Sequence, residues 1–129
     1  MEFDLALDVE KKEILVVDDD PYLRELMAIT LEDQDFDVFL AEHGMNAQEV
    51  LSRRKPHLII LDMMMPVMDG LEFLKWLREE QKSNIPVIVM TAFDGDQKID
   101  QLTSVGVSSI LIKPVPVHKL LKVVRENIR

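Results

Sequence analysis

Short runs of apolar residues, many of them β-branched, alternate along the chain with longer segments in which apolar residues recur every three or four positions. Runs without polar alternation, such as residues 58–61 and 87–90, are typical of strands buried on both faces of a parallel sheet. The longer segments have the apolar spacing of helices that cover such a sheet. The pattern predicts strands at residues 13–17, 36–41 (the most exposed), 56–62, 86–91 and 109–112.

Helix signals occupy the segments between these strands. Pro21 fits the first turn of a helix with Asp20 as its N-cap, and Asp69 with Glu72 has the spacing of a capping box. Gly106 is expected to end a weak helix just before it. The expected helices begin at Pro21, span 45–54, run from Asp69 to before Ser83, span 94–104 and span 118–128. In the first of them, the residues expected to face the sheet are Leu23, Leu26, Met27, Thr30 and Leu31.

Strands that alternate with helices predict an α/β fold, a doubly wound five-stranded parallel sheet with helices on both faces. We take the strand order 2-1-3-4-5 from the common doubly wound folds, because the residues alone do not determine it. Residues 13–129 are expected to form one domain. Residues 1–12 are a mostly acidic N-terminal extension, for which the sequence leaves a loose tail and a short helix equally open.

Composition and charge narrow the class of protein. The length of 129 residues suits one domain. Fifteen basic and 24 acidic residues give a net charge of −9, which argues against direct nucleic-acid binding and suits a basic partner or a bound cation. There is no cysteine, no apolar run of the ~18 residues that a membrane helix needs, and no signal-peptide pattern. We therefore expect a cytoplasmic domain without membrane contact.

Polar side chains follow four of the expected strands. Asp18 and Asp19 follow the first strand, Asp62 ends the third, Thr91 ends the fourth and Lys113 follows the fifth. In the assumed strand order these residues converge on one crevice at the carboxyl edge of the sheet. Three carboxylates brought together repel one another, and Mg²⁺ with water and phosphate ligands would relieve that repulsion. The hydroxyl and the ammonium group can donate to phosphate oxygens, so the set predicts phosphoryl transfer to or from a carboxylate.

Four ordered motifs resemble the receiver domain of bacterial response regulators, which has a flavodoxin-like fold. The resemblance covers the chain from about Glu13 to its end. The motifs are Val16-Val17-Asp18-Asp19-Asp20-Pro21, Asp62-Met63-Met64-Met65-Pro66-Val67-Met68-Asp69-Gly70, Thr91-Ala92 and Lys113-Pro114.

The resemblance implies a phosphoacceptor and a metal site. Asp62 would accept a phosphoryl group from a phosphohistidine of a sensor histidine kinase or phosphotransfer protein. Asp19, Asp62 and the backbone carbonyl of Met64 would hold Mg²⁺, with Asp18 reaching the ion through water. Such a domain catalyses its own phosphorylation and dephosphorylation rather than turning over a substrate.

The resemblance also implies a switch, with one departure from the family pattern. Lys113 would pair with the phosphoryl group, its peptide bond to Pro114 would be cis, and Thr91 would move toward the phosphoryl group. The family usually has Tyr or Phe where this chain has Ile110, and polar residues are frequent where it has Phe93. The output face, formed by the fourth helix, fifth strand and fifth helix, is a possible homodimer surface and is expected to switch mainly through Thr91 and the weak fourth helix.

A haloacid-dehalogenase-like phosphatase is an alternative, since that family also combines an aspartate nucleophile, Mg²⁺, a threonine and a lysine. The triplet 18–20 fits its Asp-x-Asp motif, and Thr91 and Lys113 would fill the next two motifs. Tyr22, however, stands where that family has Thr or Val, and no aspartate follows Lys113 to complete its metal site. Phosphate on Asp18 rather than Asp62 would identify this class.

A second alternative is a receiver-like fold that takes no phosphate and serves only as an interaction module. Taken alone, a strand-end aspartate usually starts a turn, and a strand-end threonine usually bonds to local backbone. A lone lysine at such a position is usually solvated. The set is intact in this chain, which argues against an interaction module that has lost its chemistry.

Overall fold

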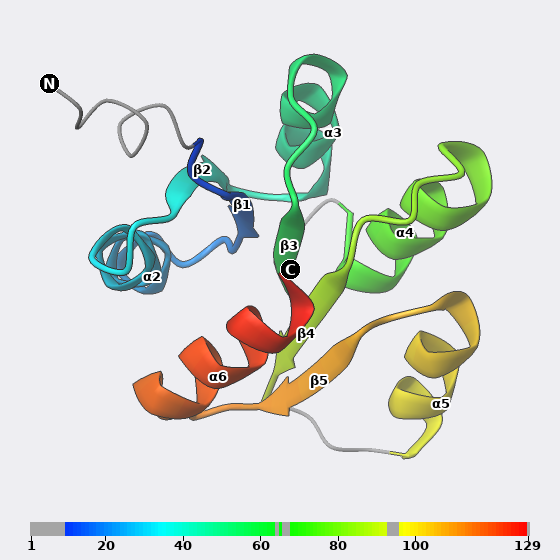
Figure 1. The fold of residues 1–129 in the computed structure, drawn as a ribbon. Helices are drawn as coiled ribbons and strands as arrows, with labels where there is room; N and C mark the ends of the chain where they lie inside the picture. The colour runs from blue at the N-terminus through cyan, green and yellow to red at the C-terminus, as the bar shows by residue number, and fades with distance from the viewer. Residues whose placement is uncertain (1–9, 64, 66–67, 93–95, 129) are drawn as a thin grey trace, which may run out of the picture.

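A five-stranded parallel sheet forms the centre of the computed structural model, which describes residues 10–63, 65, 68–92 and 96–128 (Figure 1). The strand order is β2-β1-β3-β4-β5, which confirms the predicted topology. The strands are β1 (Glu13–Val17), β2 (Asp37–Ala41), β3 (Leu58–Asp62), β4 (Val87–Thr91) and β5 (Ser109–Ile112). The helices are α2 (Pro21–Glu32), α3 (Gly44–Arg53), α4 (Gly70–Lys75), α5 (Asp96–Val105) and α6 (Val117–Asn127). None of these helices is long and apolar enough to cross a membrane.

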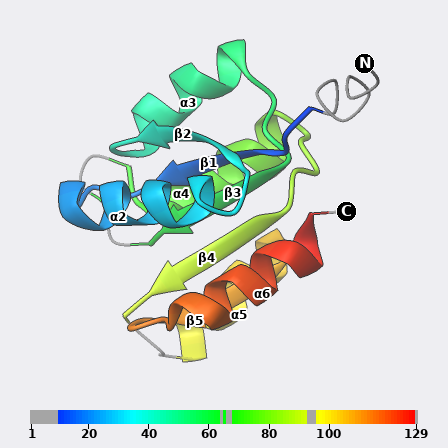
Figure 2. The same ribbon diagram turned by 60° about the vertical axis from the view of Figure 1, so that its left-hand side comes forward.

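Helices cover both faces of the sheet, with α2 and α6 on one face and α3, α4 and α5 on the other (Figure 1 and Figure 2). Successive side chains of a strand point to opposite faces, so each strand contributes to two cores. In β3, Leu58 and Ile60 pack with α2 and α6, whereas Ile59 and Leu61 pack with the other three helices. All five residues of β3 are buried, as predicted for a strand covered on both sides.

The register of the strands sets their carboxyl ends at one edge of the sheet. Val17 at the end of β1 lies opposite Leu61, and Asp62 lies opposite Met90. Thr91, one residue further along β4, is paired with the end of β5. The residues that end or follow β1, β3, β4 and β5 therefore share this edge.

The predicted helix boundaries rest on local hydrogen bonds. The carboxylate of Asp20 accepts from backbone amides two and three residues ahead, at 2.9 and 3.3 Å. Asp69 and Glu72 form the predicted capping box, with bonds of 2.9 and 3.3 Å. Gly106 follows α5 at a φ of 116°, a conformation that favours glycine, and its amide donates to the Leu102 carbonyl at 2.9 Å.

The structure corrects the predicted inward face of α2. Met27, Ala28 and Leu31 are buried, but Leu26 is 47% exposed. Each helical residue is rotated by about 100° from the one before, which places Leu26 nearly opposite the centre of the buried stripe. Only some of the apolar residues that recur at helical spacing in α2 are therefore part of the core.

The helix that begins with α4 ends in a π-helical segment, η1 (Trp76–Glu80), which the apolar pattern does not predict. Its residue Arg78 donates to the Ser83 carbonyl at 2.9 Å and to the Gly106 carbonyl at 3.0 Å. Burial lowers the pKa of this guanidinium from its ordinary value. Arg78 thus ties together the segments that lead into β4 and β5.

Candidate functional site

Three carboxylates gather where β1 and β3 end side by side. Asp18 and Asp19 follow β1, Asp62 ends β3, and each offers a carboxylate oxygen within 4.8 Å of the others. The side chains of Asp18 and Asp62 are buried, whereas Asp19 is exposed. The predicted acidic cluster is therefore present, and it opens to solvent on the side of Asp19.

Hydrogen bonds hold both the side chain and the backbone carbonyl of Asp18, the first residue after β1. Its carboxylate accepts from the Asp20 amide at 2.9 Å, and its carbonyl accepts from the Arg24 guanidinium at 2.8 Å. Burial raises the pKa of the Asp18 carboxyl, and the charges of Asp19 and Asp20 raise it further. The Asp20 amide and the Lys113 ammonium act in the opposite direction but do not cancel the effect of burial.

Lys113 reaches the cluster from the end of β5. Its Nζ lies 3.2 Å from Oδ1 of Asp62, and its side chain is 25% exposed. Its backbone amide donates to the Thr91 carbonyl at 2.7 Å, which fixes the turn after β5 beside the end of β4. The peptide bond to Pro114 is cis, as the family resemblance implies.

Thr91 ends β4 and is 4% exposed. It lies at the same edge of the sheet as Asp62, because the residue before it is the partner of Asp62 in the register. Two positions singled out in the sequence, Met64 and Phe93, lie outside the described residues, so their expected places are not described.

The chemistry of this donor set fits a hard divalent cation. Carboxylate oxygens are the protein ligands that Mg²⁺ prefers, and it commonly keeps several waters beside one or two carboxylates. The three carboxylates within 4.8 Å of one another supply such oxygens, and the exposure of Asp19 leaves room for waters. The ammonium of Lys113 pairs with Oδ1 of Asp62 at the same place.

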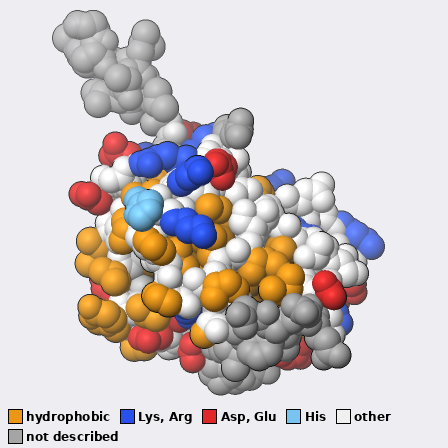
Figure 3. Space-filling model, turned by 90° about the horizontal axis from the view of Figure 1, so that it is seen from below, with side chains coloured by type: hydrophobic (Ala, Val, Ile, Leu, Met, Phe, Trp, Pro, Cys, Tyr) orange, Lys and Arg blue, Asp and Glu red, His pale blue; other side chains and the backbone are white. Residues whose placement is uncertain are grey.

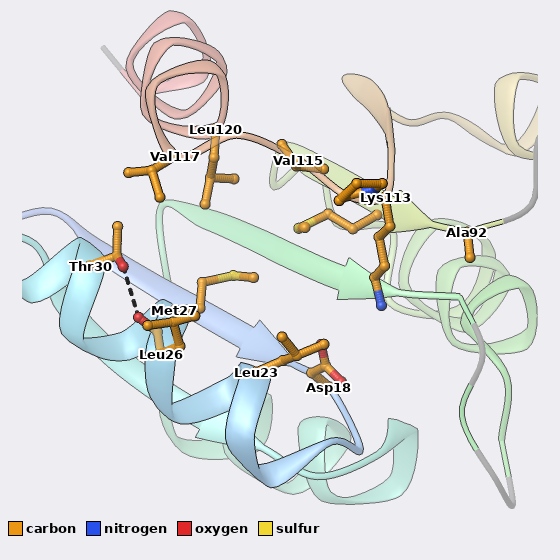
Figure 4. A pocket seen from close by; sticks show the side chains of 12 residues that line it. Asp18, Leu23, Leu26, Met27, Thr30, Ala92, Lys113, Val115, Val117 and Leu120 are labelled. Atoms are coloured by element: carbon orange, nitrogen blue, oxygen red, sulfur yellow. Dashed lines mark hydrogen bonds between the residues drawn. The ribbon is translucent and has the colours of Figure 1, made fainter.

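Two features near the site were not predicted from the sequence. Arg24, which is not among the residues of its helix expected to face the sheet, donates to the Asp18 carbonyl six residues back. No spacing rule identifies such a contact, because it depends on the path of the loop. The second feature is an apolar groove of about 520 Å³ between α2 and α6, which ends at Asp18 and Lys113 (Figure 4).

Comparisons with known proteins agree with this geometry. The family model of the response regulator receiver domain matches residues 14–125. The chain is 37% identical over 117 residues to the DNA-binding dual master transcriptional regulator RpaA of Synechocystis sp., covering 90% of this chain and 48% of that protein. It is 36% identical over 115 residues to an uncharacterized 14.6 kDa protein of Leptolyngbya boryana, covering 88% of each chain. The chain thus spans about half the length of the Synechocystis regulator.

Solved structures give the same family. The chemotaxis protein CheY4 of Vibrio cholerae aligns with a TM-score of 0.86 at 30% identity, covering 92% of this chain and 100% of that one. A response regulator receiver protein from Pseudomonas putida aligns with a TM-score of 0.87 at 27% identity, covering 92% and 98%. With the sheet order, the strand-end residues and the family match over residues 14–125 taken together, the chain belongs to the receiver domains of two-component response regulators.

Proposed function

We propose that Asp62 accepts a phosphoryl group from a phosphohistidine on a sensor histidine kinase or phosphotransfer protein, in a Mg²⁺-dependent reaction. One observation carries the proposal. The Lys113 ammonium lies 3.2 Å from Oδ1 of a buried Asp62, with two further carboxylates within reach of one cation. A nucleophilic carboxylate needs such neighbours, because the group that it receives is itself negatively charged.

The chemistry at Asp62 is a substitution at phosphorus. A carboxylate oxygen of Asp62 forms the new O–P bond while the N–P bond to the donor imidazole breaks, and the ring nitrogen keeps the electron pair. Lys113 would donate charge-assisted hydrogen bonds from its ammonium to the phosphoryl oxygens. The bond from its backbone amide to the Thr91 carbonyl holds the residue in position for this. Thr91, at the same edge, would approach the phosphoryl group and carry the change toward α5.

Receiver domains depend on magnesium in general, and the acidic cluster of this chain fits that requirement. Asp19, Asp62 and the backbone carbonyl of Met64 would hold the ion, with Asp18 reaching it through water. When bound, the ion neutralises charge that builds up on the transferring group. Asp18 and Asp19 then serve mainly to hold the ion in place, and Asp62 alone forms a bond to phosphorus.

The partners follow from this chemistry and from the charge of the chain. The family interacts with histidine kinases or phosphotransfer proteins, which would be the donors here. A net charge of −9 argues against direct contact of this domain with nucleic acid, although the Synechocystis relative is DNA-binding. The surface formed by α5, β5 and α6 is the proposed output face and a possible homodimer surface, and the cytoplasmic location stays a prediction.

The division of the chain also stays a prediction. The family match begins at residue 14, close to the expected boundary between the extension, residues 1–12, and the receiver domain, residues 13–129.

The phosphatase alternative would place the nucleophile at Asp18. The pairing of Lys113 with Asp62 supports Asp62 instead.

Intact-mass measurement tests the assignment of the phosphoacceptor. We expect the wild type to gain one phosphoryl mass from acetyl phosphate in Mg²⁺ and to gain none in EDTA. Asp62→Asn removes the nucleophilic carboxylate and should abolish the gain. Asp69→Asn is a matched control, because asparagine keeps the N-cap of α4, and it should behave as the wild type. If Asp62→Asn gained as much mass as the wild type, Asp62 would not be the phosphoacceptor.

A further inference from the structure

Apolar side chains are uncovered on the two helices that flank the groove. Figure 4 shows α2 along one wall of the groove and α6 along the other. On α2, Tyr22, Leu26 and Ile29 are 73%, 47% and 57% exposed, and their helical spacing places them in one stripe on the outside of the helix. Val117 at the start of α6 is 54% exposed and lines the groove. Of the six large hydrophobic residues that are exposed in the described part of the chain, four thus belong to this face.

The exposed charges of the two walls have opposite signs. From residue 21 to residue 35, every charged side chain that is exposed is acidic, and the partly buried Arg24 donates to the Asp18 carbonyl. Along α6 the exposed charged side chains are basic apart from Glu126. Figure 3 shows basic side chains and a histidine beside a field of hydrophobic side chains on the face seen from below. The acidic residues of the α2 wall are Glu25, Glu32, Asp33 and Asp35, and the exposed residues of α6 with basic or imidazole side chains are His118, Lys119, Lys122 and Arg125.

A hydrogen bond shows which side of α6 faces α2. The Arg125 guanidinium donates to the side chain of Gln34, which lies just after α2. This bond uses one N–H group of the guanidinium, and the remaining ones can still bind a carboxylate. Charged residues within about 60° of Arg125 around the helix belong to the same side, whereas Lys119 and Glu126 lie at least about 100° away. The basic and imidazole side chains beside the groove are therefore those of His118, Lys122 and Arg125.

The two helices run in the same direction along the groove, as the order of their colours in Figure 2 shows. Asp18 and Lys113, which shortly precede the two helices, lie at one end of the groove, and the bond between Arg125 and Gln34 joins the walls at the other. A two-fold axis parallel to the helices can therefore bring α2 of a second copy into the groove. The same rotation turns the side of α2 that faces away from its own groove toward α6 of the other copy.

We propose that this face binds a second copy of the chain, with α2 of each copy seated in the groove of the other. The stripe of Tyr22, Leu26 and Ile29 enters the groove, whose volume of about 520 Å³ receives several side chains. Glu25 and Glu32, on the side of α2 away from its own groove, face the basic stripe of α6 in the other copy. Such an interface is self-complementary, because each copy supplies one acidic and one basic wall. It lies on the other side of α6 from the proposed output face.

The contact is small, so we expect a weak and reversible dimer. The 12 residues of α2 extend over about 18 Å, and one seated helix from each copy gives an interface at the low end of the specific range. Sedimentation equilibrium should therefore show dimers at high micromolar concentration. The measurement uses the metal-free chain without a phosphodonor, so its result does not depend on phosphoryl transfer to Asp62. A chain that stays monomeric up to millimolar concentration would overturn the proposal.

Charge reversal tests the pairing of the two walls. Glu32→Lys places like charges opposite Lys122 of the other copy and should raise the dissociation constant by about tenfold or more. Lys122→Glu should have the same effect, because it places like charges opposite Glu32. An equal mixture of these two variants restores opposite charges at both symmetric places and should dimerise as strongly as the wild type. Lys75→Glu, at an exposed position of α4 on the other face of the sheet, is the matched control and should leave the dissociation constant unchanged.

Substitution in the apolar stripe tests the centre of the interface. Leu26→Asp should abolish dimerisation, whereas Met45→Asp, at an exposed position of α3, should not. Thermal melting followed by circular dichroism shows that each variant is folded. Dimers that survive both charge reversals, or a mixture that dimerises no better than its components, would overturn the proposal. Loss of the dimer in Lys119→Glu but not in Lys122→Glu would place the contact on the output side of α6 and would equally overturn it.

Discussion

Burial of Asp18 makes its protonation matter for folding. The pKa of this carboxyl is raised above the ordinary value of 3.8, first by burial and then by the charges of Asp19 and Asp20. The folded state therefore binds this proton more tightly than the unfolded state does. The resulting stabilisation is fully present below pH 3.8 and is lost as the pH rises through the folded-state pKa. At neutral pH an ionised Asp18 costs the metal-free protein stability.

We expect Asp18→Asn to stabilise the metal-free protein at neutral pH, because the amide has no charge to desolvate. The advantage over the wild type should shrink as the pH approaches 3.8. Urea unfolding in EDTA at several pH values measures both effects. Asp100→Asn, at an exposed position of α5, is the control and should change little. A variant less stable than the wild type at neutral pH would contradict the account.

The residues of the site were predictable where they follow a buried strand. Asp62 and Lys113 could be found because an apolar run ends abruptly in a charged residue, and the sheet order then brings the strand ends together. Arg24 could not be found, since its bond to Asp18 depends on the path of one loop. Leu26 was assigned to the core because helical spacing does not separate a buried stripe from the wall of a groove.

At the scale of elements, α5 and β5 are where phosphorylation is expected to act. Ile110 of β5 is partly buried against the core under α4 and α5. An isoleucine there should stay packed in both states, since exposing it costs roughly 1.5–3 kcal/mol. Arg78 donates to the Gly106 carbonyl just after α5, so we expect the response of this helix to be larger at its other end, which is closer to Thr91 in the sequence.

Hydrogen exchange with the beryllofluoride mimic tests this assignment. We expect the largest change in protection between residues 91 and 107, and a smaller change at Ile110. Thr91→Ala removes the hydroxyl that would approach the phosphoryl group and should flatten the change, while Asp62 remains phosphorylatable. Thr91→Ser keeps a hydroxyl and should retain most of the response. Equal protection changes in Thr91→Ala and the wild type would show that Thr91 does not carry the signal.

At the scale of the whole molecule, the sequence predicted the sheet and its helices because alternating apolar runs and helical segments leave few compatible topologies. The strand order came from known doubly wound folds, and the structure confirms it. The π-helical turn at Trp76 and the groove between α2 and α6 were not predictable. Both depend on how whole helices pack against the sheet, and the spacing of apolar residues does not determine that packing.

The acidic cluster should couple the stability of the whole domain to Mg²⁺. Because the ion binds the folded state, it should stabilise the protein by about 2.7 kcal/mol at a concentration 100 times its Kd. Melting curves at low ionic strength measure this shift, since added salt screens the repulsion among the carboxylates. Asp19→Asn should remove most of it, and Asp100→Asn should keep it. If Mg²⁺ left the melting temperature of the wild type unchanged, the carboxylates would not form a cation site.

Locating the phosphoryl group in the chain tests the central claim most directly. Borohydride reduces an aspartyl phosphate to homoserine, which tandem mass spectrometry can place at a single residue. After reaction with a phosphohistidine donor in Mg²⁺, we predict homoserine at position 62 and none in EDTA. Homoserine at position 18, or a phosphoryl group that reaches position 62 equally well without a divalent cation, would contradict the account.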